Sequence, residues 1–207
     1  MGQIQGAILA QFSGASDGVL YQAQGSRFAE STTVIHDNST DYPKGGKYDK
    51  IRPFYDAAVN GEDAFIAKLR QRGFSEKFPR EYAAVWDETG KLHMVSMGRA
   101  NGHSVQFQFL DNATVIHSHP SGLPPSPQDV HQFLNGNMKK MEIVTKNGIY
   151  SLTRSAKGSK LTDKETSDLI FERFNNIAAK RNPMVVSFDE WEKILDGTKC
   201  KISYMDS

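Results

Sequence analysis

The stretch ATVIHSHPSGLPPSPQDV, residues 113–130, decides how the rest of the chain is interpreted. It places His117 and His119 one residue apart at the end of an apolar run, and Asp129 after a turn rich in Pro and Gly. On an extended strand, side chains two residues apart point to the same face, so both imidazoles can reach one point. Two nitrogens and one carboxylate oxygen around an open fourth position are the donor set of a catalytic zinc site. The stretch therefore predicts a zinc centre held by His117, His119 and Asp129.

Each half of this stretch also has an interpretation without a metal. A pair of histidines on a strand can be incidental. The tetrapeptide SPQD at 126–129 has the pattern of a helix start, with Ser as N-cap, Pro at the first helical position and an acid at the third. The helix-start interpretation is compatible with the metal site, because a capped helix would hold Asp129 rigidly toward the histidines. We expect this helix to end at Gly136.

Composition and charge exclude several classes of protein. With 207 residues, 25 Lys and Arg and 24 Asp and Glu, the chain has a formal net charge of +1, which gives no general attraction to nucleic acid or to an anionic membrane. One cysteine, Cys200, excludes an internal disulfide. We find no signal peptide, and no run approaches the ~18 apolar residues of a spanning helix. We therefore expect a soluble, cytoplasmic protein that does not bind a membrane.

The first 75 residues are expected to form a partly helical N-terminal extension. Residues 1–45 are dominated by Gly, Ser, Gln and Asn, and their one strand-like run is Ser31 to His36. The spacing of apolar residues predicts one helix over 51–60, with Pro53 near its start, and a second over 62–72 that ends at Gly73. We expect both helices to pack on the domain that follows, residues 76–207.

From residue 81 the pattern changes to strands with helices between them. EYAAVW and KLHMVSMG on either side of DETG predict a β-hairpin, and SVQFQFL at 104–110 predicts a half-buried strand. MEIVTKNGIYSLTR predicts a second hairpin around Asn147-Gly148. A long amphipathic helix is predicted over 161–180 and a short one over 187–194. This order predicts an α/β fold, a layered sheet with helices packed against it.

HSHPSGLPPSPQD, residues 117–129, resembles the His-x-His-Pro…Ser-x-x-Asp signature of the JAMM (MPN-plus, JAB) zinc metalloproteases. HPSG and the Pro-rich turn after it resemble the RadC-type branch of this family. The resemblance therefore points to its prokaryotic or phage-associated members. The resemblance covers Glu81 to Arg154, with one residue fewer between His119 and Ser126 than the commonest family spacing. It implies a JAB/MPN-like, cytidine-deaminase-like fold, which is a three-layer mixed sheet with flanking helices.

The resemblance also implies a role for each site residue. The family binds Zn²⁺ through the two histidines and the aspartate, and needs a glutamate upstream. Glu81, directly before an apolar strand, is the best match, and it would take a proton from the attacking water and deliver it to the leaving nitrogen. Ser126 matches the family serine, which would hydrogen-bond the developing oxyanion. Glu88, in the hairpin turn, is the second candidate for the glutamate.

The leading hypothesis is a zinc-dependent peptidase or isopeptidase acting on a protein or peptide. The resemblance favours deconjugation or processing of a ubiquitin-like or other small protein. Two other classes stay open: a non-catalytic interaction module on the same fold, and a RadC-like protein associated with nucleic acid. The complete His, Ser and Asp set disfavours the first, and the near-zero net charge disfavours the second. The absence of a PCxxC motif disfavours a zinc deaminase.

The remaining histidines and the cysteine receive structural interpretations. His36, His93, His103 and His131 have no paired spacing, and we expect them at the surface or at ordinary polar positions. His131 follows Asp129 by two residues on the predicted helix, so it points elsewhere. Cys200 has no His or acid pattern near it, so we do not expect it to be a nucleophile.

Overall fold

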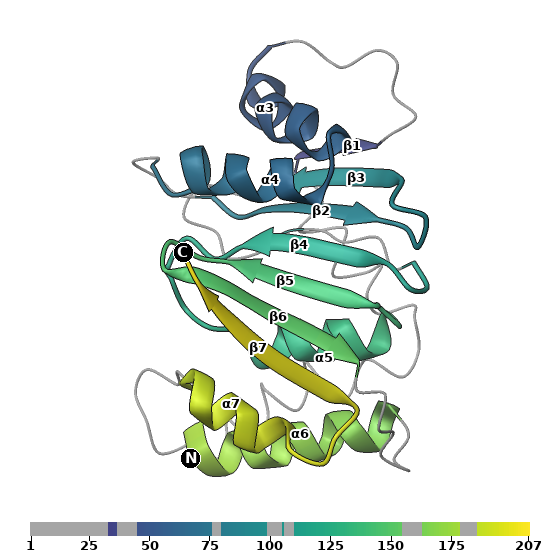
Figure 1. Cartoon of the computed structure of the whole chain (residues 1–207), viewed down its shortest axis with the longest axis vertical. Helices are drawn as coiled ribbons and strands as arrows, with labels where there is room; N and C mark the ends of the chain where they lie inside the picture. Colours follow the sequence, from purple (N-terminus) through teal and green to yellow (C-terminus); the bar gives the residue numbers. More distant parts are fainter. Residues whose placement is uncertain are drawn as a thin grey trace. The chain divides into compact units, whose positions relative to one another are not determined.

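The apolar runs of the chain pair into one mixed sheet in the computed structural model, which describes residues 33–36, 45–75, 80–98, 105, 110–154, 163–178 and 186–207 (Figure 1). The strand order is β1-β3-β2-β4-β5-β6-β7. The strands are β1 (Thr33–His36), β2 (Tyr82–Trp86), β3 (Leu92–Met97), β4 (Thr114–Ser118), β5 (Lys140–Val144), β6 (Gly148–Arg154) and β7 (Cys200–Asp206). The helices are α3 (Lys47–Val59), α4 (Glu62–Lys68), continued by the π-helical turn η2 (Leu69–Gly73), α5 (Pro127–Asn135), α6 (Asp163–Ala178) and α7 (Phe188–Leu195).

The strands that position the candidate site lie in the middle of this sheet. β2 pairs antiparallel with β3 on one side and with β4 on the other. β4 pairs with β5 in parallel, while the other neighbours are antiparallel. Every residue of β2 and of β4 is buried, as expected for strands that have helices on both faces. This pairing brings the start of β2 next to the end of β4.

Each face of the sheet has its own hydrophobic core. Val115 of β4 belongs to the core formed with α5, α6 and α7, which includes Phe133. Its neighbour Ile116 points to the other face and belongs to the core formed with α3 and α4, which includes Phe65. The alternation follows from the period of two along a strand. Helices therefore cover both faces of the sheet.

Most of the local predictions are confirmed. The hairpins are β2–β3 and β5–β6, and α5 has Ser126 as N-cap and Gly136 as C-cap. The two C-terminal helices are α6 and α7. The α/β class, with a mixed sheet and flanking helices, is confirmed, whereas the JAB/MPN identity stays a prediction. The strand predicted over 104–110 lies largely outside the described residues.

The start predicted for the first helix was wrong. α3 begins at Lys47, and Pro53 lies inside it. Proline lacks the N–H that would donate to the carbonyl of Asp49, four residues earlier, and interior proline normally breaks a helix. Asp49 is exposed, so water can hydrogen-bond the carbonyl that Pro53 leaves without a helical donor.

β7 was not predicted. It pairs antiparallel with β6 from Cys200 to Asp206. Cys200 is buried and Ile202 and Tyr204 are half-buried, whereas the residues between them are exposed. The sequence CKISYMD contains the matching alternation of apolar and polar residues, which is the signal of a half-buried strand.

The helices of the predicted N-terminal extension pack on the sheet, as expected. Trp86 of β2 donates from Nε1 to the carbonyl of Ala58 in α3 at 3.2 Å. Lys140 of β5 lies 2.7 Å from the carboxylate of Glu62 in α4. Residues 33–36 and 45–75 therefore belong to the compact unit Thr33–Ser207, and a separate role for residues 1–75 stays a prediction.

A membrane crossing needs a helix that is both long and apolar, and none in the described ranges meets both requirements.

Candidate metal centre

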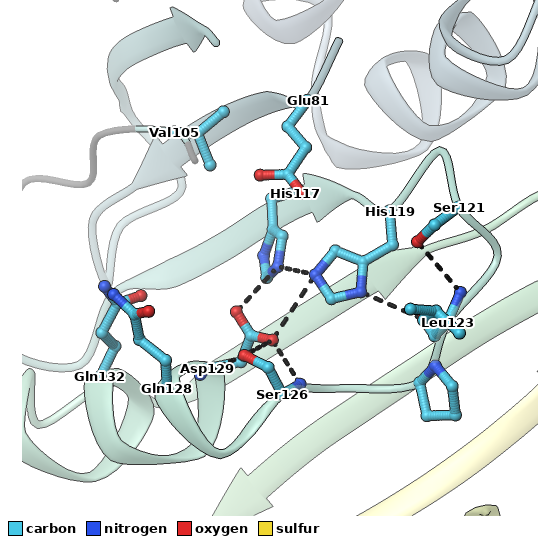
Figure 2. A pocket seen from close by; sticks show the side chains of 11 residues that line it. Glu81, Val105, His117, His119, Ser121, Leu123, Ser126, Gln128, Asp129 and Gln132 are labelled. Carbon is cyan, nitrogen blue, oxygen red and sulfur yellow. Dashed lines mark hydrogen bonds and ion pairs between the residues drawn. The ribbon is translucent and has the colours of Figure 1, made fainter. Parts of the chain in front are cut away.

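Strand alternation directs the two histidines toward α5. Val115 faces the core shared with α5, and residues two and four positions further along an extended chain point the same way. His117 is the fourth residue of β4, and His119 follows the strand directly, held by a hydrogen bond from its N–H to the carbonyl of Val144 at 2.9 Å. Asp129 lies in the first turn of α5. The side chains of all three residues converge, as the sequence predicted (Figure 2).

The distances between the three side chains fit one metal ion. His117 Nε2 lies 3.1 Å from His119 Nε2 and 3.2 Å from Asp129 Oδ1, and His119 Nε2 lies 3.5 Å from Asp129 Oδ2. Tetrahedral ligands with bonds of about 2.1 Å are about 3.4 Å apart. His117 and Asp129 are buried and His119 is half-buried. The group could therefore hold a metal ion, and its two nitrogens and one carboxylate suit zinc.

The capping box at the start of α5 fixes the Asp129 carboxylate. Ser126 donates to Asp129 Oδ2 from its backbone N–H at 2.6 Å and from its hydroxyl at 2.7 Å. In return, the Asp129 N–H donates to Ser126 Oγ at 3.2 Å. Because Oδ2 accepts both bonds, Oδ1 is the oxygen turned toward His117. The predicted helix cap and the predicted metal ligand are one arrangement.

The loop after β4 fixes the ring of His119. The carbonyl of Leu123 lies 3.1 Å from His119 Nδ1, so Nδ1 carries the ring proton and Nε2 has its lone pair free for a metal. Gly122 gives the loop its turn, with φ at 75° and a hydrogen bond from its N–H to the carbonyl of His119 at 3.0 Å. The sequence did not reveal this contact, because a backbone carbonyl is not encoded by any particular residue.

The hydrogen-bond pattern also assigns the proton of His117. Its Nε2 lies between the lone pair of His119 Nε2 and the carboxylate of Asp129, and both of these groups are acceptors. His117 Nε2 is therefore the donor when no cation is present. A metal ion bound here would replace that proton.

Burial and charge set the protonation states of the other two ligands. Burial raises the pKa of Asp129, but His119, His117 and the hydrogen bonds from His117 and Ser126 outweigh it, and the pKa is lowered. The pKa of His119 is lowered, chiefly by burial and also by His117, against the opposing influence of the Asp129 carboxylate. An ionised carboxylate and a neutral imidazole are the forms that bind a metal.

Glu81 reaches this site from the position directly before β2. The β2–β4 register pairs Ala83 with His117, and continuing it by two residues places Glu81 opposite His119. The N–H of Gly98 donates to the Glu81 carbonyl at 2.8 Å, which fixes the backbone there. The side chain is buried at 5% exposure and points toward the histidines (Figure 2). Burial, together with the negative charge of Asp129, raises its pKa from 4.5 to about 8.

These residues line one pocket of about 180 Å³. The pocket lining consists of Glu81, Val105, His117, His119, Ser121, Leu123, Pro124, Ser126, Gln128, Asp129 and Gln132. All five residues predicted for the site are among them. Gln128 and Gln132 were not predicted, although their spacing of four on a predicted helix is a readable signal that they share a face.

The other histidines lie outside this pocket. His93 pairs with Asp87 at 2.9 Å in the β2–β3 hairpin. His131 is buried rather than at the surface, and its ring contacts Ser167 of α6 and Asn135. The placement of His103 and of the His36 side chain lies outside the described residues. Glu88 is exposed in the hairpin turn.

Comparison with protein-family models, with curated proteins and with solved structures found no match.

Proposed function

We propose that the protein is a zinc-dependent peptidase or isopeptidase of the JAMM type, hydrolysing a peptide or isopeptide bond. The main support is that Glu81 shares one pocket with His117, His119 and Asp129, although 36 residues separate it from His117. A binding module has no need of a buried carboxyl beside three metal ligands. A hydrolase does need one, because the water that attacks an amide must lose a proton.

In this proposal three side-chain atoms bind the metal. His117 Nε2, His119 Nε2 and Asp129 Oδ1 would hold Zn²⁺. When bound, zinc supplies Lewis-acid polarisation of the scissile carbonyl and a lowered pKa for water. The Leu123 carbonyl and the Ser126 N–H and hydroxyl hold two of the ligands in orientation, as groups behind a metal ligand typically do.

Glu81 would move the proton. Its carboxylate takes one proton from the attacking water as the new C–O bond forms, and then delivers it to the nitrogen as the C–N bond breaks. The pKa of about 8 refers to the protein without a cation. A positive charge beside a carboxyl favours the ionised form, so a bound cation would make Glu81 available as a base near neutral pH.

The geometry supports a positioning role for Ser126. Its hydroxyl has one proton, which it donates to Asp129 Oδ2 at 2.7 Å. To stabilise an oxyanion as well, the hydroxyl would have to rotate away from Asp129. The oxyanion role stays a prediction, whereas the contact with Asp129 already gives Ser126 a function in the site.

The substrate part of the proposal rests on the family resemblance. We propose a ubiquitin-like conjugate or another small protein as the substrate, and the cytoplasm as the location of the protein. A non-catalytic module would bind zinc without cleaving anything. A nucleic-acid-associated protein would show DNA binding that falls steeply with salt concentration.

The test uses the full chain loaded with zinc. Its probes are a random mixture of quenched fluorescent peptides and a Gly-Gly peptide joined to a lysine side-chain amine. We expect about one zinc per chain and cleavage of at least one probe. Glu81→Gln should retain zinc and lose about 10²- to 10⁴-fold in rate, the usual contribution of a general base, whereas His119→Ala should lose both zinc and cleavage. Zinc binding without cleavage of either probe would overturn the proposed function. Full activity in the Gln variant would remove only the base assignment.

A further inference from the structure

Two glutamines in the pocket have no part in metal binding or proton transfer. Gln128 is exposed and Gln132 is half-buried, and both line the pocket beside Asp129. In the view of Figure 2 they lie on the opposite side of Asp129 from Leu123. Within the described part of the chain, neither carboxamide has a hydrogen-bond partner. Each therefore offers the pocket a donor and an acceptor that are not already engaged.

Their spacing matches the repeat of an extended peptide. Positions i and i+4 of a helix share a face, and four residues of α-helix rise about 6 Å. Two residues of an extended chain span about 6.6 Å, and alternate residues present their main-chain groups to the same side. Gln128 and Gln132 can therefore meet successive main-chain groups of one segment that lies along α5.

The charge of the pocket favours an uncharged ligand group beside these glutamines. The lining residues include no Lys or Arg among those that the structure describes. A terminal carboxylate or a phosphate is usually held by such cations. A carboxamide, by contrast, has the same pair of groups as a peptide unit, an N–H donor and a C=O acceptor. The pocket is thus suited to main-chain amides.

We infer that Gln128 and Gln132 are substrate-binding residues that hydrogen-bond the main chain of an extended substrate segment lying along α5. The inference rests on the proposed function and adds to it the surface on which the substrate is held. Recognition of this kind uses the backbone of the substrate, so it tolerates different side chains in that segment.

The first test separates binding from chemistry. Gln128→Met and Gln132→Met keep the length of the side chain and the helix propensity but remove both hydrogen-bonding groups. With the peptide that the wild-type chain cleaves best from the random mixture, each variant should raise KM by about 2- to 10-fold and leave kcat and zinc content unchanged. Asn176→Ala, which removes an exposed amide on α6, is the control and should change neither parameter.

The second test identifies the partner of each glutamine. Copies of the same peptide are made with single N-methylated amides, which lack one N–H. The wild-type chain should discriminate against methylation at two positions that are two residues apart. Gln128→Met should lose the discrimination at one of these positions and Gln132→Met at the other. The effects of the substitution and of the N-methylation are then non-additive, which marks a direct contact between the two groups.

The outcomes are distinct. Cleavage with unchanged KM in both Met variants, and unchanged discrimination against N-methyl peptides, would overturn this inference and leave the proposed function standing. A fall in kcat at constant KM would also overturn it, because the glutamines would then act in the chemical step. No cleavage of either probe, the peptide mixture or the Gly-Gly conjugate, by the zinc-loaded wild type would overturn both.

Discussion

The orientation of His119 depends on the backbone of the loop that follows it. Gly122 has a φ of 75°, in the region that L-residues rarely adopt, and a Cβ added there would lie 3.3 Å from Cε of Lys146. This conformation directs the Leu123 carbonyl to His119 Nδ1. A metal ligand that is well oriented by a second group binds more tightly than one that must be ordered on binding.

We expect Gly122→Ala to weaken zinc binding by about 10-fold or more, in the range found for groups behind a metal ligand. The added methyl group disfavours the left-handed backbone and with it the position of the Leu123 carbonyl. Gly90→Ala is the matched control, since Gly90 lies in the β2–β3 turn with a φ of 83°, and a Cβ added there would meet nothing within 4 Å. Competition with a chromophoric chelator measures both affinities, and equal values for the two variants would contradict the role of the loop.

Glu81 should make the stability of the metal-free protein depend on pH. Its pKa in the folded protein is raised from 4.5 to about 8, so the folded state binds the proton more tightly than the unfolded state does. The free energy of unfolding should therefore fall as pH rises from about 4.5 to 8, by an amount on the order of a few kcal/mol. Glu81→Gln removes this loss. Urea unfolding with a chelator present measures the free energy of unfolding of both proteins. The value for Glu81→Gln should rise relative to that of wild type between pH 5 and pH 8. A difference between the two free energies that stays constant with pH would contradict the raised pKa.

At the scale of elements, two of the helices in the described residues, α5 and α7, begin with the same capping box, but only α5 lies at the candidate site. In α5, Ser126 caps the helix and holds the Asp129 carboxylate. In α7, Ser187 donates to the Glu190 carboxylate from its N–H at 2.9 Å and from its hydroxyl at 3.0 Å. The two caps therefore separate the contribution to helix stability from the contribution to metal binding.

We expect Ser126→Ala and Ser187→Ala each to lower the free energy of unfolding by about 1 kcal/mol, the usual cost of losing an N-cap. Only Ser126→Ala should also weaken zinc binding, because it removes one of two hydrogen bonds that orient a ligand. Urea unfolding of the metal-free proteins and zinc titration of each variant measure the two effects. The same zinc affinity in both variants would show that the cap at Ser126 is structural alone.

The elements that could be predicted from sequence are those with local signals. α5 follows from a Ser-Pro-x-Asp start and a glycine end, and β5–β6 from Asn147-Gly148. The start of α3 was missed because the rule that proline breaks a helix is relaxed where the freed carbonyl can reach water. The Leu123 carbonyl could not be predicted, since it is placed by loop geometry rather than by residue type. Glu81 was identified through the family resemblance, and the register that sets it opposite His119 is a tertiary property.

At the scale of the whole molecule, the candidate site joins two adjacent inner strands of the sheet, β2 and β4, to α5. Its candidate ligands come from β4, from the loop after it and from α5, and Glu81 directly precedes β2. The unfolded chain would not hold these groups together. A cation that binds the assembled group therefore binds the folded state alone, and by mass action it stabilises the whole compact unit.

We expect zinc at about 100 times its dissociation constant to raise the free energy of unfolding by about 2.7 kcal/mol, and a chelator to reverse the gain. Magnesium should have no comparable effect, because it prefers oxygen ligands in octahedral geometry, whereas two of these three donors are nitrogens. His119→Ala removes one of them and should abolish the gain while leaving the metal-free protein folded, since His119 is only half-buried. Thermal or urea unfolding with zinc, with magnesium and with chelator measures the effect. An equal gain from zinc in His119→Ala and in wild type would place the stabilising metal elsewhere on the chain and would remove His119 from the centre.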